Sequence, residues 1–170
     1  MIPVLLFMGI LVAASLVIRS MKYKRKQKGN IRLLHKFRRL AETYKITITA
    51  QALLDGTILG LDGLERKLLI VQQRDGSTVV SKLIDLDDVN EFVLTKQFNA
   101  SGRWVKSPVA SEKYLEKLYL NIFLRNGHRE RICFYNYSTT PVMDLTRMAN
   151  KARHWEVMLT KLLVQKREVA

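Results

Sequence analysis

The sequence predicts an α+β fold that is mainly β, in which seven antiparallel strands form a barrel closed by a C-terminal helix. Three observations predict it. Residues 1–18 are an uncharged apolar run, residues 45–137 alternate apolar and polar side chains, and apolar residues recur with helical spacing after Pro141. The predicted segments are a transmembrane anchor (1–21), a basic stalk with an amphipathic helix (22–44) and one folded domain (45–170).

The N-terminal run is long enough for a membrane anchor. At about 1.5 Å per residue it makes a helix of about 27 Å, close to the roughly 30 Å core of a bilayer. Lys and Arg follow the run and none precedes it. Because Lys and Arg beside a spanning helix are retained on the cytoplasmic side, this placement predicts that the chain after the run lies in the cytoplasm. We expect a single-pass, N-out C-in protein of a bacterial inner membrane. The alternative, a cleaved secretory signal, predicts a basic segment before the run.

The net charge of +14 is concentrated near the N-terminus. Residues 1–45 hold eleven Lys or Arg and one acid, which gives +10, whereas residues 46–170 carry only +4. This distribution argues against nucleic acid as a partner, although Tyr119, Phe123, Tyr135 and Tyr137 could together form a stacking face for bases.

A basic amphipathic helix is predicted after the polar break at residues 27–30. Its apolar residues are Ile31, Leu34, Phe37, Leu40, Ala41 and Tyr44, and its bases are Arg32, Lys36, Arg38 and Arg39. Such a helix can lie on anionic headgroups, where each base adds about 1 kcal/mol. The alternative, which we favour, is that the apolar side docks on the folded domain.

Short runs of β-branched and aliphatic residues, separated by turn dipeptides, predict the strands. We expect them at 45–50, 55–61, 67–73, 78–84, 89–98, 115–125 and 129–137. The turns are Asp62-Gly63, Asp75-Gly76 and Asn126-Gly127, because Gly tolerates the positive φ angles of tight hairpins. In the last hairpin, Leu118, Leu120, Ile122 and Leu124 share one face, and Tyr119, Asn121, Phe123 and Arg125 share the other.

The final segment predicts a long amphipathic helix. Thr140 suits the N-cap and Pro141 the first helical position. Its apolar side is formed by Val142, Leu145, Met148, Ala149, Ala152, Trp155, Met158, Leu159, Leu162 and Leu163.

Seven strands followed by a closing helix that contains Trp155 resemble the pleckstrin-homology-like fold over about residues 45–165. The layout is also similar to that of small single-pass bacterial membrane proteins with such a domain. The segments that carry this similarity are residues 55–62 and the following residues 67–70. The resemblance implies a phosphoinositide-binding hypothesis, and the sequence argues against it. The phosphoinositide site of eukaryotic members is not carried over, because residues 49–55 contain no base.

Catalytic, cofactor and metal-binding patterns are missing from the sequence. His35, His128 and His154 fall in three different elements, and no phosphate loop, dinucleotide fingerprint or nucleophile elbow occurs. Cys133, the only cysteine, is interpreted as a structural thiol. The acidic cluster of Asp85, Asp87, Asp88 and Glu91 lacks the pattern of a calcium loop and is interpreted as a solvated turn.

We therefore expect a non-enzymatic, membrane-tethered interaction or scaffold module with the bilayer and an unidentified protein as partners. The alternative is a peripheral sensor of anionic lipid that uses the basic stalk and the 99–113 loop. The candidate contact residues are Arg19, Lys22, Lys24, Arg25, Lys26, Lys28, Arg32, Lys36, Arg38, Arg39, Arg103, Trp104 and Lys106.

Overall fold

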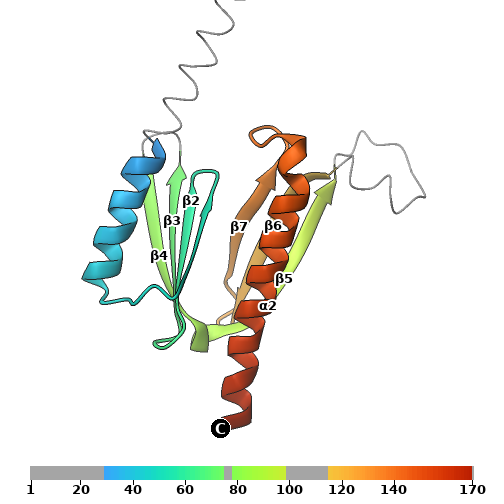
Figure 1. Ribbon diagram of the computed structural model, residues 1–170. Helices are drawn as coiled ribbons and strands as arrows, with labels where there is room; N and C mark the ends of the chain where they lie inside the picture. The colour runs from blue at the N-terminus through green and yellow to red at the C-terminus, as the bar shows by residue number, and fades with distance from the viewer. Residues whose placement is uncertain (1–28, 75–77, 99–114, 170) are drawn as a thin grey trace, which may run out of the picture.

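The computed structural model describes residues 29–74, 78–98 and 115–169, which form two antiparallel sheets and two α-helices (Figure 1). The elements are, in order, helix 29–43, β1 (Ala50–Leu54), β2 (Thr57–Asp62), β3 (Lys67–Arg74), β4 (Thr78–Asp85), η1 (Leu86–Asp88), β5 (Val89–Phe98), β6 (Leu115–Leu124), β7 (Arg129–Asn136), η3 (Val142–Asp144) and α2 (Leu145–Val169). The first sheet has the order β1-β2-β3-β4, and the second has the order β5-β6-β7.

The first sheet is buried on both faces, so β2 and β3 are almost continuously apolar. Its outer face packs on helix 29–43, where Leu33, Phe37 and Ala41 form one cluster with Ile58, Leu69 and Val71. The helix therefore docks on the domain, as favoured, but Leu33 lies at the centre of the contact and Ile31 and Tyr44 are exposed. Phe37 lies so close to β2 that a Cβ atom at Gly60 would be 2.4 Å from its Cζ atom.

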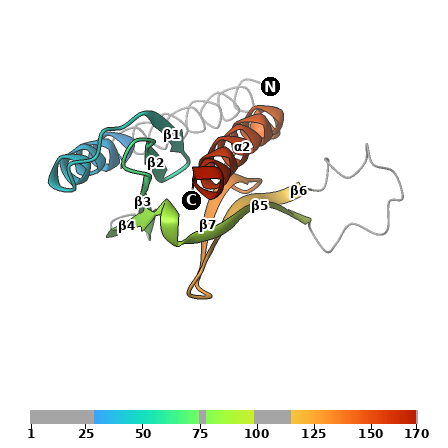
Figure 2. The ribbon, with the colours of Figure 1, turned by 90° about the horizontal axis from the view of Figure 1, so that it is seen from below.

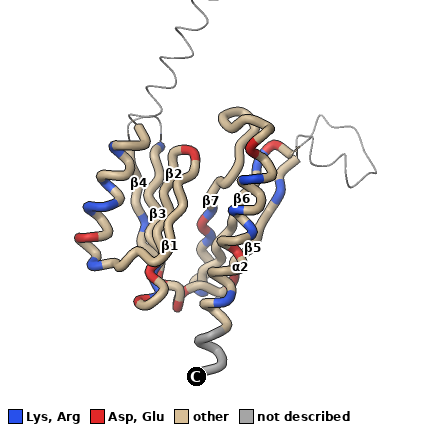
Figure 3. The backbone as a smooth tube through the Cα atoms, in the orientation of Figure 1, with Lys and Arg blue, Asp and Glu red and all other residues tan. Residues whose placement is uncertain are grey.

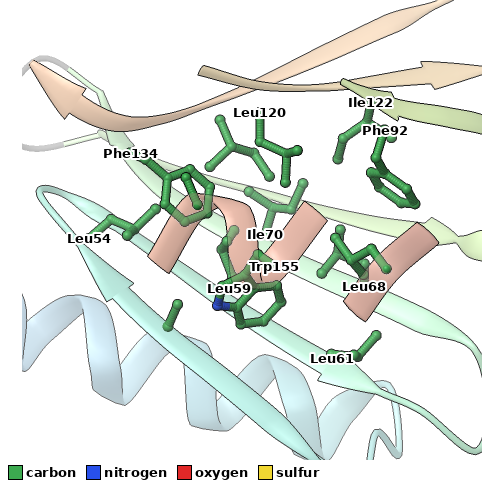
Figure 4. Close-up of a cluster of buried hydrophobic side chains, with 14 of the residues drawn as sticks. Leu54, Leu59, Leu61, Leu68, Ile70, Phe92, Leu120, Ile122, Phe134 and Trp155 are labelled. Carbon is green, nitrogen blue, oxygen red and sulfur yellow. The ribbon is translucent and has the colours of Figure 1, made fainter. Parts of the chain in front are cut away.

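The main core lies between the inner faces of the two sheets and α2. Leu59, Ile70, Leu120 and Phe134 point into it from four strands (Figure 4). Trp155 of α2 enters the same cluster and is 3% exposed. Figure 2 shows α2 lying over the second sheet, with helix 29–43 on the far side of the first. Burial of these faces is the main source of stability.

The predicted closed barrel is wrong. The described strands form two separate sheets, and no backbone ladder joins a strand of one sheet to a strand of the other. The chain passes from β4 to β5 through the short turn η1, which redirects it into the second sheet. Where β4 and β7 approach, the contact is a side-chain ion pair between Lys82 and Glu130.

The expectation of a single-pass, N-out C-in membrane protein is also corrected. Across the described ranges, no helix combines the length and the apolar character needed to cross a bilayer. Helix 29–43 is short and basic, and α2 carries Arg147, Lys151 and Arg153 among its 25 residues. The predicted anchor, residues 1–21, lies outside the described residues.

The largest differences from the predicted element boundaries are at the first strand and at the start of the C-terminal helix. The first strand begins at Ala50 rather than at residue 45, because the first hairpin turns at Asp55-Gly56, where Gly56 has φ +66°. Asn126-Gly127 forms the predicted turn, with φ +81° at Gly127. At the C-terminus, η3 precedes α2, Pro141 is its cap and Val142 is 55% exposed. Thr140 therefore caps no α-helix.

The turn between β2 and β3 is held by two charged side chains. Asp62 is fully buried and accepts hydrogen bonds from the backbone N–H groups of Thr47, Leu64 and Glu65. Burial raises the pKa of Asp62, but these donors and nearby Lys67 lower it more, so the pKa lies below its ordinary value. Arg66 donates to Asp87 in η1 and to the carbonyl oxygen of Leu162 in α2.

Candidate functional site

The outer face of the second sheet differs from the other sheet faces because no described helix or strand covers it (Figures 1 and 2). The strand register aligns its outward residues in rows. One row contains Val93, Asn121 and Arg131, the next contains Thr95, Tyr119 and Cys133, and another contains Glu91, Phe123 and Arg129. We call the surface of these nine residues the outer sheet face.

Asn121 organises the outer sheet face. Its side chain is fully buried although it points away from the core. The amide nitrogen donates to the carbonyl oxygen of Val93 at 3.1 Å and to Oγ1 of Thr95 at 2.7 Å. The amide oxygen accepts from Nε and Nη2 of Arg129 at 3.1 and 2.6 Å. One side chain therefore links all three strands and fixes the guanidinium of Arg129.

Both arginines of the outer sheet face lie over aromatic rings of β6. Arg129 Cζ is 5.0 Å from the centroid of Phe123, and Arg131 Cζ is 4.8 Å from that of Tyr119. Such cation–π contacts hold the guanidinium planes in place. Because the two arginines are two residues apart on one strand, their Cα atoms are separated by roughly 6.6 Å and their side chains share one face.

Neither guanidinium forms an ion pair within the described part of the chain. The ion pairs found there involve other side chains, such as Lys117 with Glu116 and Arg147 with Asp144. Glu91 shares a row with Arg129 but forms no ion pair with it. The charge of Arg129 and Arg131 is therefore available to an external anion, in a planar geometry that matches carboxylate and phosphate.

Cys133 lies beside the arginines and is half-buried. Its thiol donates to the carbonyl oxygen of Tyr135 at 3.2 Å. Burial raises the pKa of the Cys133 thiol above its ordinary value, more than nearby Lys117 lowers it. The thiol is therefore protonated at neutral pH and is a poor nucleophile, consistent with a structural role.

The predicted stacking face is only partly present. Tyr119 and Phe123 point outward, but Tyr135 is 1% exposed and belongs to the main core. The cause is a bulge in β7, where Tyr135 pairs with Leu118 and Cys133 pairs with Tyr119, so that Phe134 is the extra residue. The rings of Tyr119 and Phe123 are themselves covered by guanidinium groups, whereas Tyr137 is exposed just beyond the end of β7.

The basic residues predicted for partner or membrane contact lie elsewhere. Arg32, Arg38 and Arg39 are on the exposed side of helix 29–43. Lys36 is also exposed and donates to the carbonyl oxygen of Val79 at 2.9 Å, so it ties the helix to β4. Figure 3 shows these bases along the helix. Arg19, Lys22, Lys24, Arg25, Lys26, Lys28, Arg103, Trp104 and Lys106 lie outside the described residues.

Sequence reasoning missed Arg129 and Arg131 as site residues. The sequence did contain a signal for them. In the strand after the Asn126-Gly127 turn, Arg129 and Arg131 occupy alternate positions that face away from the apolar side. The acidic cluster forms the predicted turn only in part: Asp85 caps η1 and Asp87 accepts from Arg66, but Glu91 lies on β5. Within the described ranges, no group of three or more His, Cys, Asp or Glu side chains could hold a metal ion.

The outer sheet face and helix 29–43 thus offer two basic surfaces, and only the first has its cations fixed by neighbouring side chains. No protein-family model, curated protein or solved structure matches the chain. No match bears on the resemblance to pleckstrin-homology-like domains, and the closed barrel expected with it is replaced by two separate sheets.

Proposed function

We propose that this protein is a non-enzymatic interaction module whose outer sheet face binds an acidic segment of a partner protein. The observation that carries the proposal is the pair of stacked arginines, because Arg129 and Arg131 are held in place and form no ion pair within the described residues. A carboxylate can accept two parallel N–H donors from each guanidinium.

An extended acidic segment fits this face better than a nucleic acid does. The spacing of the arginines matches side chains at alternate positions of an extended partner chain, which lie roughly 6.6 Å apart. Base stacking would require free aromatic faces, and the guanidinium groups already lie over both rings. The partner is therefore expected to carry Asp or Glu at alternate positions.

The proposal is tested with the full-length protein and a fluorescent 12-residue peptide of alternating Glu and Val. Fluorescence anisotropy should show saturable binding that the double variant Arg129→Gln/Arg131→Gln weakens about tenfold or more, since charged hydrogen bonds contribute about 1.5–3 kcal/mol each. Arg125→Gln, an exposed base at the end of the hairpin, is the matched control and should change binding little.

Two outcomes can overturn the proposal. A 12-nucleotide single-stranded DNA that binds more tightly than the peptide and depends on the same arginines would identify a nucleic-acid surface instead. Equal binding of the acidic peptide to wild type and double variant would remove Arg129 and Arg131 from any binding role.

A second candidate function is peripheral contact with anionic lipid through helix 29–43. Its support is that Arg32, Arg38 and Arg39 are exposed while the apolar side of the helix is buried on the first sheet. The contact would be electrostatic, without insertion of the helix, and therefore sensitive to salt. Co-sedimentation with phosphatidylserine vesicles should decrease in Arg32→Gln/Arg39→Gln, and no change in that variant would contradict this candidate.

A further inference from the structure

A groove of about 450 Å³ lies between α2 and the edge of the first sheet, away from the outer sheet face. Its lining residues are Thr49, Leu61, Gly63, His154, Val157, Met158, Lys161 and Leu162. The volume falls in the range of small-molecule sites, about 300–1,000 Å³. None of these residues takes part in the function proposed above.

The groove is preformed, because hydrogen bonds hold its walls. The Thr49 hydroxyl donates to the carbonyl oxygen of Leu61 at 3.0 Å and accepts from the N–H of Gly63 at 3.0 Å. Arg66, three residues after Gly63, donates to the carbonyl oxygen of Leu162 at 2.8 Å and so connects the two walls. These polar wall groups are already paired, which leaves the groove an apolar surface.

The groove lining also contains a histidine and a lysine among its apolar side chains. His154 and Lys161 are seven residues apart on α2, about two turns, so they share one side of the helix. Both are exposed, and neither forms an ion pair within the described ranges. Val157 lies between them and is 47% exposed. The groove therefore combines an apolar floor with an unpaired ammonium group at its rim.

We propose that this groove binds a medium-chain carboxylic acid, with the alkyl chain along Val157, Met158 and Leu162 and the carboxylate on the Lys161 ammonium. An alkyl chain suits walls whose hydrogen-bonding groups are already paired, whereas a peptide backbone would need free donors and acceptors there. The anionic head matches the charge at the rim. The ligand class follows from these two features together.

Methionine methyl groups provide the test. The full-length protein, labelled with ¹³C-methyl methionine, is titrated with sodium decanoate at millimolar concentrations below its micelle threshold. The Met158 methyl resonance should shift and saturate, while that of Met143, which is 95% exposed in η3, should stay in place. Decanol and decyltrimethylammonium, which lack the carboxylate, should shift Met158 less.

Three variants complete the design. Lys161→Gln should weaken decanoate binding roughly two- to fivefold, the scale of one exposed ion pair. Lys151→Gln, on the same helix but outside the groove lining, is the matched control. Val157→Asp should abolish binding by placing a negative charge on the groove wall, and its exposure makes the change compatible with folding.

The proposal is overturned if the Met158 methyl does not shift with decanoate, or if all three probes shift it equally. Its failure is separate from failure of the acidic-peptide proposal, because Arg131→Gln alters only the outer sheet face and should leave decanoate binding unchanged.

Discussion

The two sheets use their second faces differently. The first sheet carries helix 29–43 on its outer face and the main core on its inner face, so that Ile58 and Leu59, neighbours on β2, are both 0% exposed. The second sheet is packed against the core and α2 on one side only. Its outer face bears Asn121 and the stacked arginines Arg129 and Arg131 in place of an apolar layer.

This difference separates side chains that maintain the fold from side chains that are free to bind. On the first sheet even the buried charge of Asp62 is used internally, in three backbone hydrogen bonds. On the second sheet the guanidinium groups are oriented but form no ion pair within the described residues. The second sheet is therefore the better place to look for function.

The largest expected contrast is between two phenylalanines on the outer sides of the sheets. Phe37→Ala should lower the free energy of unfolding by about 3–5 kcal/mol, because Phe37 is 2% exposed between helix and sheet. Phe123→Ala should cost about 1 kcal/mol, since a half-buried ring loses mainly its contact with Arg129. Urea denaturation of both variants measures the difference. Equal losses would contradict the distinction between the sheets.

The next largest expected loss of stability comes from the close approach of helix 29–43 to the first sheet. Gly60→Ala should destabilise by about 1–3 kcal/mol, because the new Cβ atom would overlap Phe37 Cζ at 2.4 Å and Ile48 Cδ1 at 2.8 Å. Gln51→Ala, the exposed partner of Gly60 on β1, is the control. Adding Phe37→Leu should restore part of the loss in thermal melts. No restoration would mean that the overlap is not the cause.

A pH-dependent effect follows from Asp62. Its lowered pKa means that the ionised carboxylate stabilises the folded state above the ordinary value of 3.8, and that this stabilisation is lost as the pH falls through the folded-state pKa. Asp62→Asn should cost about 1–2 kcal/mol at neutral pH and progressively less in acid. Denaturation from pH 7 to pH 2 measures this, with Glu42→Gln as an exposed control. A gap between wild type and Asp62→Asn that stays constant across the range would refute the assignment.

The smallest effect on stability should come from the site itself. Arg131→Gln should change the free energy of unfolding by less than about 0.5 kcal/mol, because its side chain is exposed. The same variant should clearly weaken binding of the alternating Glu-Val peptide. A large loss of stability in Arg131→Gln would mean that the arginine serves the fold rather than a partner.

Local patterns in the sequence predicted the hairpin of β6 and β7 well. Alternation placed Leu118, Leu120 and Ile122 on the buried face, and the Asn126-Gly127 turn lies where expected. The first strand was misplaced because the pattern of apolar and polar residues continues through residues 45–61. The pattern therefore gives no sign of the turn at Asp55-Gly56. A Gly with positive φ was the deciding feature there.

Features that depend on distant contacts were not predictable. Whether seven strands close into a barrel depends on how β4 and β7 meet, and they meet through Lys82 and Glu130 rather than through a ladder. The bulge that turns Tyr135 inward leaves no local signature. The alternate positions of Arg129 and Arg131 could have been read from the sequence, but the hydrogen bonds from Arg129 to Asn121 require three strands in register.

The buried amide of Asn121 also constrains how the second sheet assembles. A slip of one residue along β6 would turn this side chain toward the apolar core, away from Val93, Thr95 and Arg129, and would bury an amide without partners. The buried amide therefore adds to the preference for the native alignment that the buried Leu118, Leu120 and Ile122 already give. Asn121→Val would remove this polar contribution, and duplicate amide resonances from β5–β7 would reveal coexisting alignments.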